Sequence, residues 1–207
     1  MAPTFHAASI DEHLRNQPMG EFFVRHHSIN AAQVRRFEEC LTAASDEKPL
    51  QSFFEENPTL LIQHLRASGR FVIPQKRLGA EFVPDFVVGE HHSFGYDWHL
   101  IELESPRIPL FTKGGDPRAQ LTHAIRQIHD WRAWLQRNQN YASRTRSESG
   151  LGLIDITSNV PGLIIMGRRS LLNSSTNDRR RQMIADLNIQ IHTYDYILER
   201  ARAAVVA

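Results

Sequence analysis

The stretch YDWHLIELES, residues 96–105, is typical of a strand that begins in a hydrophobic core and ends in two acids. Side chains alternate between the two faces of a strand, so the apolar Trp98 and Leu100 share one face with the acids. Glu102 and Glu104 would lie roughly 7 Å apart on that face, where two like charges repel each other. Water, a basic neighbour or a metal ion must compensate, and each alternative implies a different function.

The segments around this stretch predict an α/β fold. The segment GEHHSFG at 89–95 is typical of a turn between antiparallel strands, and the clearest helix carries an apolar stripe from Leu121 to Leu135. Strands are expected at 70–75, 81–90, 96–105 and 161–167 and from 189, and helices at 30–44, 46–57, 120–135 and 178–187 and at the end of the chain. This order favours a mixed β-sheet flanked by helices.

Length and composition indicate one domain of an ordinary globular protein. The chain has 207 residues, of which 41% are hydrophobic and 23% charged, and no apolar run approaches the roughly 18 residues of a membrane helix. The first residues lack the pattern of a secretory signal, and the single Cys40 allows no internal disulfide. We expect a weakly structured arm at 1–28, a domain at 29–207, a cytoplasmic location and no membrane partner.

The net charge of +1 hides an asymmetry between the two halves of the chain. Residues 1–100 carry 9 basic and 13 acidic side chains, whereas residues 101–207 carry 15 basic and 10 acidic ones. Only three of the 24 basic residues are lysines, and arginine suits bidentate contacts to phosphate or carboxylate. The basic half is compatible with nucleic-acid binding, but a solvated basic surface is the commoner explanation of such a charge.

A third acid precedes the pair. Asp85 follows Pro84 in one expected strand, and Glu102 follows 17 residues later in the next. If these strands pair, Asp85 can lie beside Glu102 and Glu104. Oxygen ligands of this kind bind Mg²⁺, and a metal held by carboxylates can promote phosphodiester hydrolysis. The alternative is that the two glutamates line the solvated face of an edge strand.

Three blocks of the sequence resemble one protein family. They are PDF at 84–86, LIELESP at 100–106 and LFTKGGDPRAQLTHAIRQIHDW at 110–131. Together they resemble the nuclease domain of the Shedu anti-phage defence proteins, within the PD-(D/E)xK restriction-endonuclease-like superfamily. FFEENPTLL at 53–61, PGLIIMGRR at 161–169 and IHTYDYIL at 191–198 extend the resemblance over roughly residues 30–204. It implies a restriction-endonuclease-like core.

The resemblance assigns roles to the acids. It implies that Asp85 and Glu102 bind Mg²⁺, with Mn²⁺ as a substitute, and that Leu103 offers its main-chain carbonyl. Glu104 stands where the superfamily usually has its catalytic lysine. Some restriction endonucleases similarly use Glu-x-Glu and leave water activation to the metals, whereas other members with altered triads are inactive. Both interpretations of Glu104 remain open.

Further site residues are expected from the helices. Glu55 matches the acid that the first helix of the superfamily often contributes, or else faces solvent together with Glu56. Gln127 and Trp131 resemble a Gln-x-x-x-Tyr signature with Trp in place of Tyr, and one helical turn separates them. Trp131 continues the apolar stripe and is expected in the core, so Gln127 is the better site candidate.

Basic residues complete the hypothesis. The expected phosphate contacts are Lys113, Arg118, His123 and Arg126, each with the alternative of an exposed surface position. Lys113 is also a candidate to replace the absent lysine. The resemblance therefore predicts a homo-oligomeric, Mg²⁺-dependent DNA endonuclease in anti-phage defence. Its trigger would act through the arm at 1–28, the surface of the domain or a regulatory partner of unknown identity. The alternatives are an inactive DNA-binding or assembly module and an RNA-directed nuclease.

Overall fold

The computed structural model of the chain describes residues 12–13, 19–25, 29–63, 65 and 69–205. Its centre is a five-stranded sheet whose spatial order follows the chain, β1-β2-β3-β4-β5. The strands are β1 Gly69–Pro74, β2 Phe86–His92, β3 Gly95–Leu103, β4 Gly162–Ile165 and β5 Ile189–His192. The first three strands pair antiparallel and the last three pair parallel, so the sheet is mixed as predicted.

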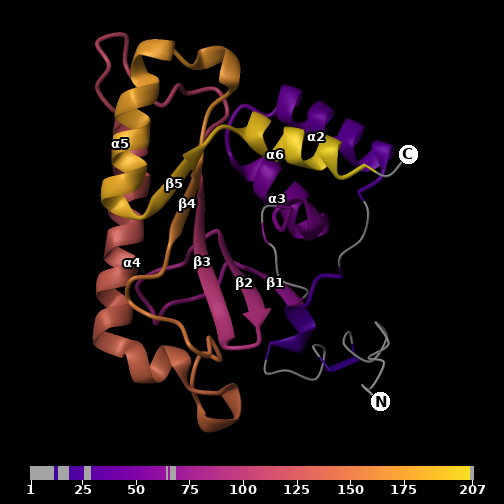
Figure 1. The fold of residues 1–207 in the computed structure, drawn as a ribbon, viewed down its shortest axis with the longest axis vertical. Coiled ribbons are helices and arrows are strands. Elements are labelled where there is room, and N and C mark those ends of the chain that lie inside the picture. The colour runs from indigo at the N-terminus through magenta and orange to yellow at the C-terminus, as the bar shows by residue number, and fades with distance from the viewer. Residues whose placement is uncertain (1–11, 14–18, 26–28, 64, 66–68, 206–207) are drawn as a thin grey trace.

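Helices cover both faces of this sheet (Figure 1). On one side lie α4 Ala119–Ser143 and α5 Asn177–Leu187, and on the other lie α2 Ala31–Ala43, α3 Lys48–Glu56 and α6 Tyr194–Ala203. Single 3₁₀ turns occur at Gly20–Phe22, Pro58–Leu60, Arg146–Glu148, Arg169–Leu171 and Ser174–Thr176. The predicted α/β fold is confirmed, and the arrangement is that of a restriction-endonuclease-like core.

Two hydrophobic cores result from the alternation of side chains along the strands. Leu100 of β3 packs into the core beneath α4 and α5, whereas Ile101 and Leu103 pack into the core beneath α2, α3 and α6. Both faces of β3 are therefore buried. The face shared by Trp98 and Leu100 becomes charged only at the end of the strand, as the sequence predicted.

Two predicted boundaries were wrong. β2 begins at Phe86 rather than 81, because Pro84 has no N–H for the ladder and Leu78 and Phe82 form an isolated bridge instead. The segment 137–143, expected in a loop, belongs to α4, which continues past a bend at Asn138 (φ −122°, ψ 24°). The amide of Asn138 donates to the Trp134 carbonyl at 2.9 Å and supports this bend.

The start of the chain is described only in part. Within the arm expected at 1–28, residues 19–25 contact β1: Met19 is buried in the core, and the Val24 N–H donates to the Arg70 carbonyl at 2.8 Å. Apart from residues 12–13, the remainder of that arm lies outside the described residues. In the part of the chain that the structure describes, no helix has the length and apolar character needed to cross a bilayer.

Candidate active site

Glu102 and Glu104 lie at the carboxyl end of β3, and both line one pocket of about 430 Å³. Glu102 is buried, and Glu104 is half-buried just beyond the strand. The Glu104 N–H donates to the Ile165 carbonyl of β4 at 2.9 Å, which continues the parallel ladder and fixes the direction of the chain there. The prediction that the two carboxylates face the same side is confirmed.

Asp85 reaches the same strand end from β2. The ladder between β2 and β3 ends at the pair Phe86–Ile101, so Leu103 extends past the end of β2. The Leu103 N–H instead donates to Asp85 Oδ2 at 2.8 Å. Both main-chain groups of a strand residue face the same neighbouring strand, so the Leu103 carbonyl also faces the Asp85 side.

A fourth acid, Glu47, was missed by the sequence analysis. It precedes α3, lines the pocket with Glu102 and Glu104, and contributes to the raised pKa values of Asp85 and both pocket glutamates. Its position in SDEKP suggested only a helix start. Glu47 is the N-cap residue of α3, and the preference for acids near a helix N-terminus was the only sequence signal for it.

Residues just after β3 hold Glu47 in place. The Arg107 guanidinium donates from Nε to the Ala44 carbonyl at 2.8 Å and from Nη2 to the Thr42 carbonyl. Ser105 Oγ donates to the Ser45 carbonyl at 3.2 Å. The turn between α2 and α3 is therefore fastened to the end of β3, and this places Glu47 beside the other acids.

Burial and mutual repulsion raise the pKa values of these carboxyls. Burial, followed by the charges of Asp85 and Glu104, raises the pKa of Glu102 to about 9. Burial and the charges of Glu47 and Asp85 raise the pKa of Glu104 to about 7. Burial raises the pKa of Asp85 to about 6, although the hydrogen bond from Leu103 opposes the shift. Among the described residues, the largest causes of these shifts are burial and other carboxylates, which favour the protonated forms, and no basic side chain is among them.

Helix α4 supplies polar groups to the other wall of the pocket. The Gln127 side chain hydrogen-bonds to Glu102 and opposes the rise of its pKa, and His123 lines the pocket one turn earlier. Trp131, a further turn along, is 1% exposed and belongs to the core, as expected. Gln127 and His123 therefore lie beside the acids, whereas Trp131 is not part of the pocket.

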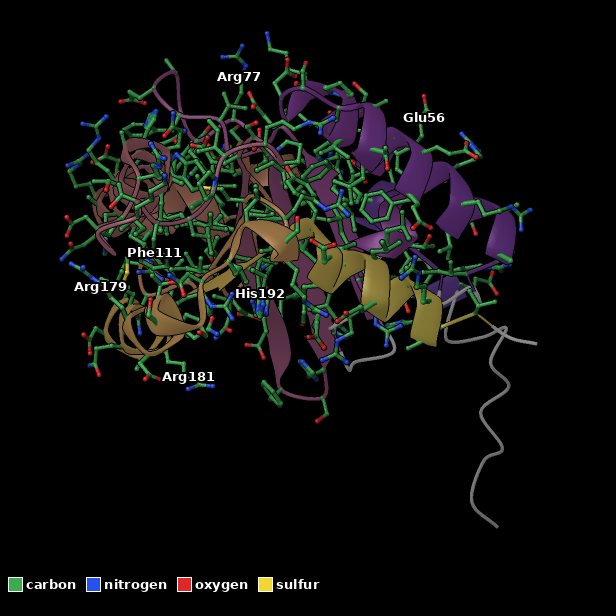
Figure 2. The ribbon with its side chains drawn as sticks, turned by 90° about the horizontal axis from the view of Figure 1, so that it is seen from above. Glu56, Arg77, Phe111, Arg179, Arg181 and His192 are labelled. Carbon is green, nitrogen blue, oxygen red and sulfur yellow. The ribbon has the colours of Figure 1, made fainter. Side chains whose placement is uncertain are left out.

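Three predicted contacts lie elsewhere. Lys113 and Arg118 line a separate pocket of about 220 Å³ together with Phe111, whose position is labelled in Figure 2. Arg126 is exposed on α4 and does not line the acidic pocket. The placement of Lys113 does not support its candidacy as a substitute for the absent lysine.

Glu55 lies at the edge of the site. It is exposed, accepts a hydrogen bond from Gln51 at 3.3 Å and lines a different pocket that includes Pro74 and Phe86. Its charge contributes to the raised pKa of Asp85, but not to those of Glu102 and Glu104. Among the acids of the first helices, Glu47 and not Glu55 therefore lines the pocket.

Tyr194 supports the site from the opposite core. Its ring is buried and stacks on Phe54 at 6.5 Å, and its hydroxyl donates to the Glu104 main-chain carbonyl at 2.9 Å. Burial and the charges of the four acids raise the pKa of the Tyr194 phenol well above its usual value, so it remains a neutral donor. The Glu104 main chain is therefore held from both the sheet and α6.

The oxygen donors at the end of β3 fit a divalent cation. Mg²⁺ needs oxygen ligands and keeps several waters, so one or two protein carboxylates suffice. Asp85, Glu102 and the Leu103 carbonyl supply such oxygens, and a cation would offset the repulsion that raises the pKa values. Among the residues that the structure describes, no group of three His, Cys, Asp or Glu side chains is arranged to hold a metal. The fit therefore rests on two carboxylates and a main-chain oxygen.

Comparison with models of known protein families gives a match. A family model described as "Shedu protein SduA, C-terminal" matches residues 44–198. The match begins in the turn before α3 and ends within α6, so it includes all four acids and the helix that carries Gln127. Comparison with curated proteins found no match.

Proposed function

Because the chain belongs to the Shedu SduA family, whose model matches residues 44–198, we propose that it is a metal-dependent nuclease that cuts DNA in defence against phage. Family membership indicates anti-phage defence. Mg²⁺ as the cofactor, with Mn²⁺ as a substitute, and hydrolysis of phosphodiester bonds are the further steps of this proposal. A PD-(D/E)xK-type site built on Asp85 and Glu102 belongs to the same proposal.

The observation that carries the proposal is that Glu47, Glu102 and Glu104 line one pocket, while Asp85 accepts a hydrogen bond from Leu103 beside it and its charge acts on both pocket glutamates of the strand end. Such a cluster costs stability when its members ionise, so a fold that serves only structure gains nothing from it. A bound divalent cation supplies Lewis acidity both for the phosphodiester and for the attacking water. Asp85, Glu102 and the Leu103 carbonyl would hold it.

The remaining residues have roles that follow from their positions. Glu104, with a pKa of about 7, can accept a proton from the attacking water near neutral pH, which is the task that a general base performs. Gln127 orients Glu102, and the Leu103 N–H orients Asp85. His123 is placed to contact a phosphate oxygen of a substrate in the pocket. This assignment gives the carboxylate of Glu104 a function in place of the lysine.

The second candidate is a nuclease-like DNA-binding or assembly module without catalysis. Two observations favour it: Glu104 replaces the usual lysine, and the acids of the described chain are not arranged as a ready three-side-chain metal site. Such a module would bind DNA equally well with and without Mg²⁺. An RNA substrate is the third alternative, and a substrate panel distinguishes it.

The decisive experiment is cleavage of supercoiled plasmid, linear duplex DNA and RNA by the purified protein with Mg²⁺ or Mn²⁺, beside an EDTA control. We expect nicking or linearisation of DNA that requires the metal and is lost in Glu102→Ala. Glu39→Ala, which removes an exposed acid of α2, is the matched control and should cleave normally. Folded wild-type protein that binds DNA but leaves every substrate intact with either metal would refute the nuclease proposal.

A further inference from the structure

A second group of charged and aromatic side chains lies where β5 ends. His192 is the last residue of β5, and Figure 2 labels it between the ribbons of α5 and α6. Its neighbours are Arg180 from α5 and Tyr196 and Arg200 from α6. We call these four residues the basic cluster.

Ring stacking gives the cluster a defined geometry. The His192 and Tyr196 rings stack with centroids 3.9 Å apart and planes 12° from parallel. The Arg200 guanidinium lies over the Tyr196 ring, with its central carbon 5.4 Å from the ring centroid. A cation over an aromatic face is attracted by the ring, so this column holds Arg200 near the end of β5.

One donor of the Arg180 guanidinium has no partner within the described residues. Its Nε atom is buried and lacks a hydrogen-bond acceptor among the described residues. Burial, followed by the charges of Arg181 and Arg169, lowers the pKa of Arg180. Burial and the charges of Arg180 and Arg200 lower the pKa of His192 to about 4. Each buried polar atom without a partner calls for an explanation, and an external acceptor is one.

Neighbouring arginines show the alternative arrangement. Arg168 makes hydrogen bonds from Nε and Nη2 to Asp195, at 3.1 Å and 3.0 Å to its two oxygens. Arg169 pairs with Glu199. These arginines have carboxylate partners within the chain, whereas Arg180 and Arg200 make no ion pair within the described residues. The basic cluster therefore contains two positive charges available to an outside anion.

The cluster lies at the same edge of the sheet as the acidic pocket. His192 is paired with Ile165 of β4, and Ile165 is paired with Leu103 of β3. Two strand spacings separate the backbones of His192 and Leu103, about 10 Å. Glu102 shares the sheet face of Leu100 and Ile191, whereas His192 lies on the opposite face, so the two groups flank the same end of the sheet.

We propose that the basic cluster is a phosphate-binding site that holds the backbone of a nucleic acid whose reacting bond lies in the acidic pocket. Guanidinium groups match phosphate geometry bidentately, and Arg180 and Arg200 supply two of them with unused donors. Contacts of this kind position a nucleic acid without reading its sequence. The proposal rests on the proposed function for the choice of nucleic acid as the ligand.

The test measures binding separately from cleavage. Fluorescence anisotropy of a labelled DNA duplex in EDTA, at several salt concentrations, would compare wild type with R200A and with R180A/R200A. We expect the double variant to bind roughly tenfold more weakly at low salt and its salt slope to fall by about 1, with a smaller effect for R200A. R137A removes an exposed arginine of α4 and should bind as wild type does.

Further outcomes decide between the sources of the phosphate. Unchanged affinity and salt slope in folded R180A/R200A would overturn the proposal. Inorganic phosphate could instead shift the NMR signals of Arg180 and His192 while R200A and R180A/R200A bind DNA as wild type does. That result would assign the site to a free phosphate and would also overturn the proposal. Because the assay needs no metal, a chain that binds through the cluster but cuts nothing would support this site while refuting the nuclease.

Discussion

The two ends of the β2–β3 pair both carry a buried acid, but among the described residues only the end near the turn has an arginine and a histidine beside it. Near the turn, His92 Nε2 lies 3.6 Å from Glu90 Oε2 and 3.5 Å from Asp97 Oδ2. Arg70 of β1 is the cross-strand partner of Glu90. The chain therefore supplies countercharges for the acids at this end.

At the other end, the acids face one another. Glu102 is as buried as Glu90, at 7% and 8% exposure, yet the charges that act on it come from other carboxylates. Burial is therefore not what distinguishes the two ends. The difference lies in the neighbours: Glu90 has basic side chains beside it, whereas the charges beside Glu102 are those of other carboxylates, which favour its protonated form.

The most direct way to break this comparison is to neutralise one acid at each end. Glu102→Gln should reduce DNA cleavage by roughly a thousandfold, because it removes an oxygen ligand that positions the metal. Glu90→Gln should leave cleavage near the wild-type rate and lower the free energy of unfolding by about 1–3 kcal/mol, because His92 and Arg70 lose a buried partner. Single-turnover cleavage and urea unfolding measure both effects. Equal loss of activity in the two folded variants would contradict the distinction.

The pH dependence of stability in the same two variants gives a second test of the comparison. The pKa of Glu102 is about 9 in the fold against an ordinary value of 4.5, so the folded state holds a proton that the unfolded state has lost between these values. Stability of the metal-free protein should therefore fall as pH rises from 4.5 toward 9. Glu102→Gln removes this penalty and should raise the free energy of unfolding by more than about 1.4 kcal/mol at pH 8, and by almost nothing at pH 4.

Urea unfolding in EDTA at the two pH values measures this effect. Glu90→Gln is the control, and its free energy of unfolding should stay below that of wild type at pH 8. A gain for Glu102→Gln that is the same at pH 4 and pH 8 would show that its carboxyl is not protonated in the fold.

The smallest expected effect concerns the hydrogen bonds of Arg107 that hold the turn before Glu47. Arg107→Ala removes the hydrogen bonds to the Ala44 and Thr42 carbonyls and loosens the turn that places Glu47. We expect a few-fold increase in the Mg²⁺ concentration needed for half-maximal cleavage, with the rate at saturating metal nearly unchanged. Metal titrations of Arg107→Ala and of the control Arg137→Ala measure this. An unchanged metal requirement would mean that Glu47 does not contribute to cation binding.

Local patterns in the sequence were sufficient for most of the fold. The alternation in YDWHLIELES predicted a strand with an acidic end, and the apolar stripe from Leu121 predicted α4 and the burial of Trp131. The strand end also predicted that Glu102 and Glu104 share one side. These predictions succeeded because periods of two and of 3.6 residues are local properties of the chain. The boundaries that failed, at β2 and at the end of α4, depend on bridges and bends that periodicity does not encode.

The position of Glu47 and the composition of the basic cluster were decided only by the tertiary structure. Glu47 reaches the pocket because Arg107 and Ser105, about 60 residues away, fasten its turn to β3. Lys113 and Arg118 line a separate pocket and not the acidic one, because the loop that carries them folds on itself through the Phe111–Pro117 bridge. The sequence by itself determined which residues carry charge and which face of an element they occupy. Which charges meet depends on long-range contacts, and chain spacing does not specify these.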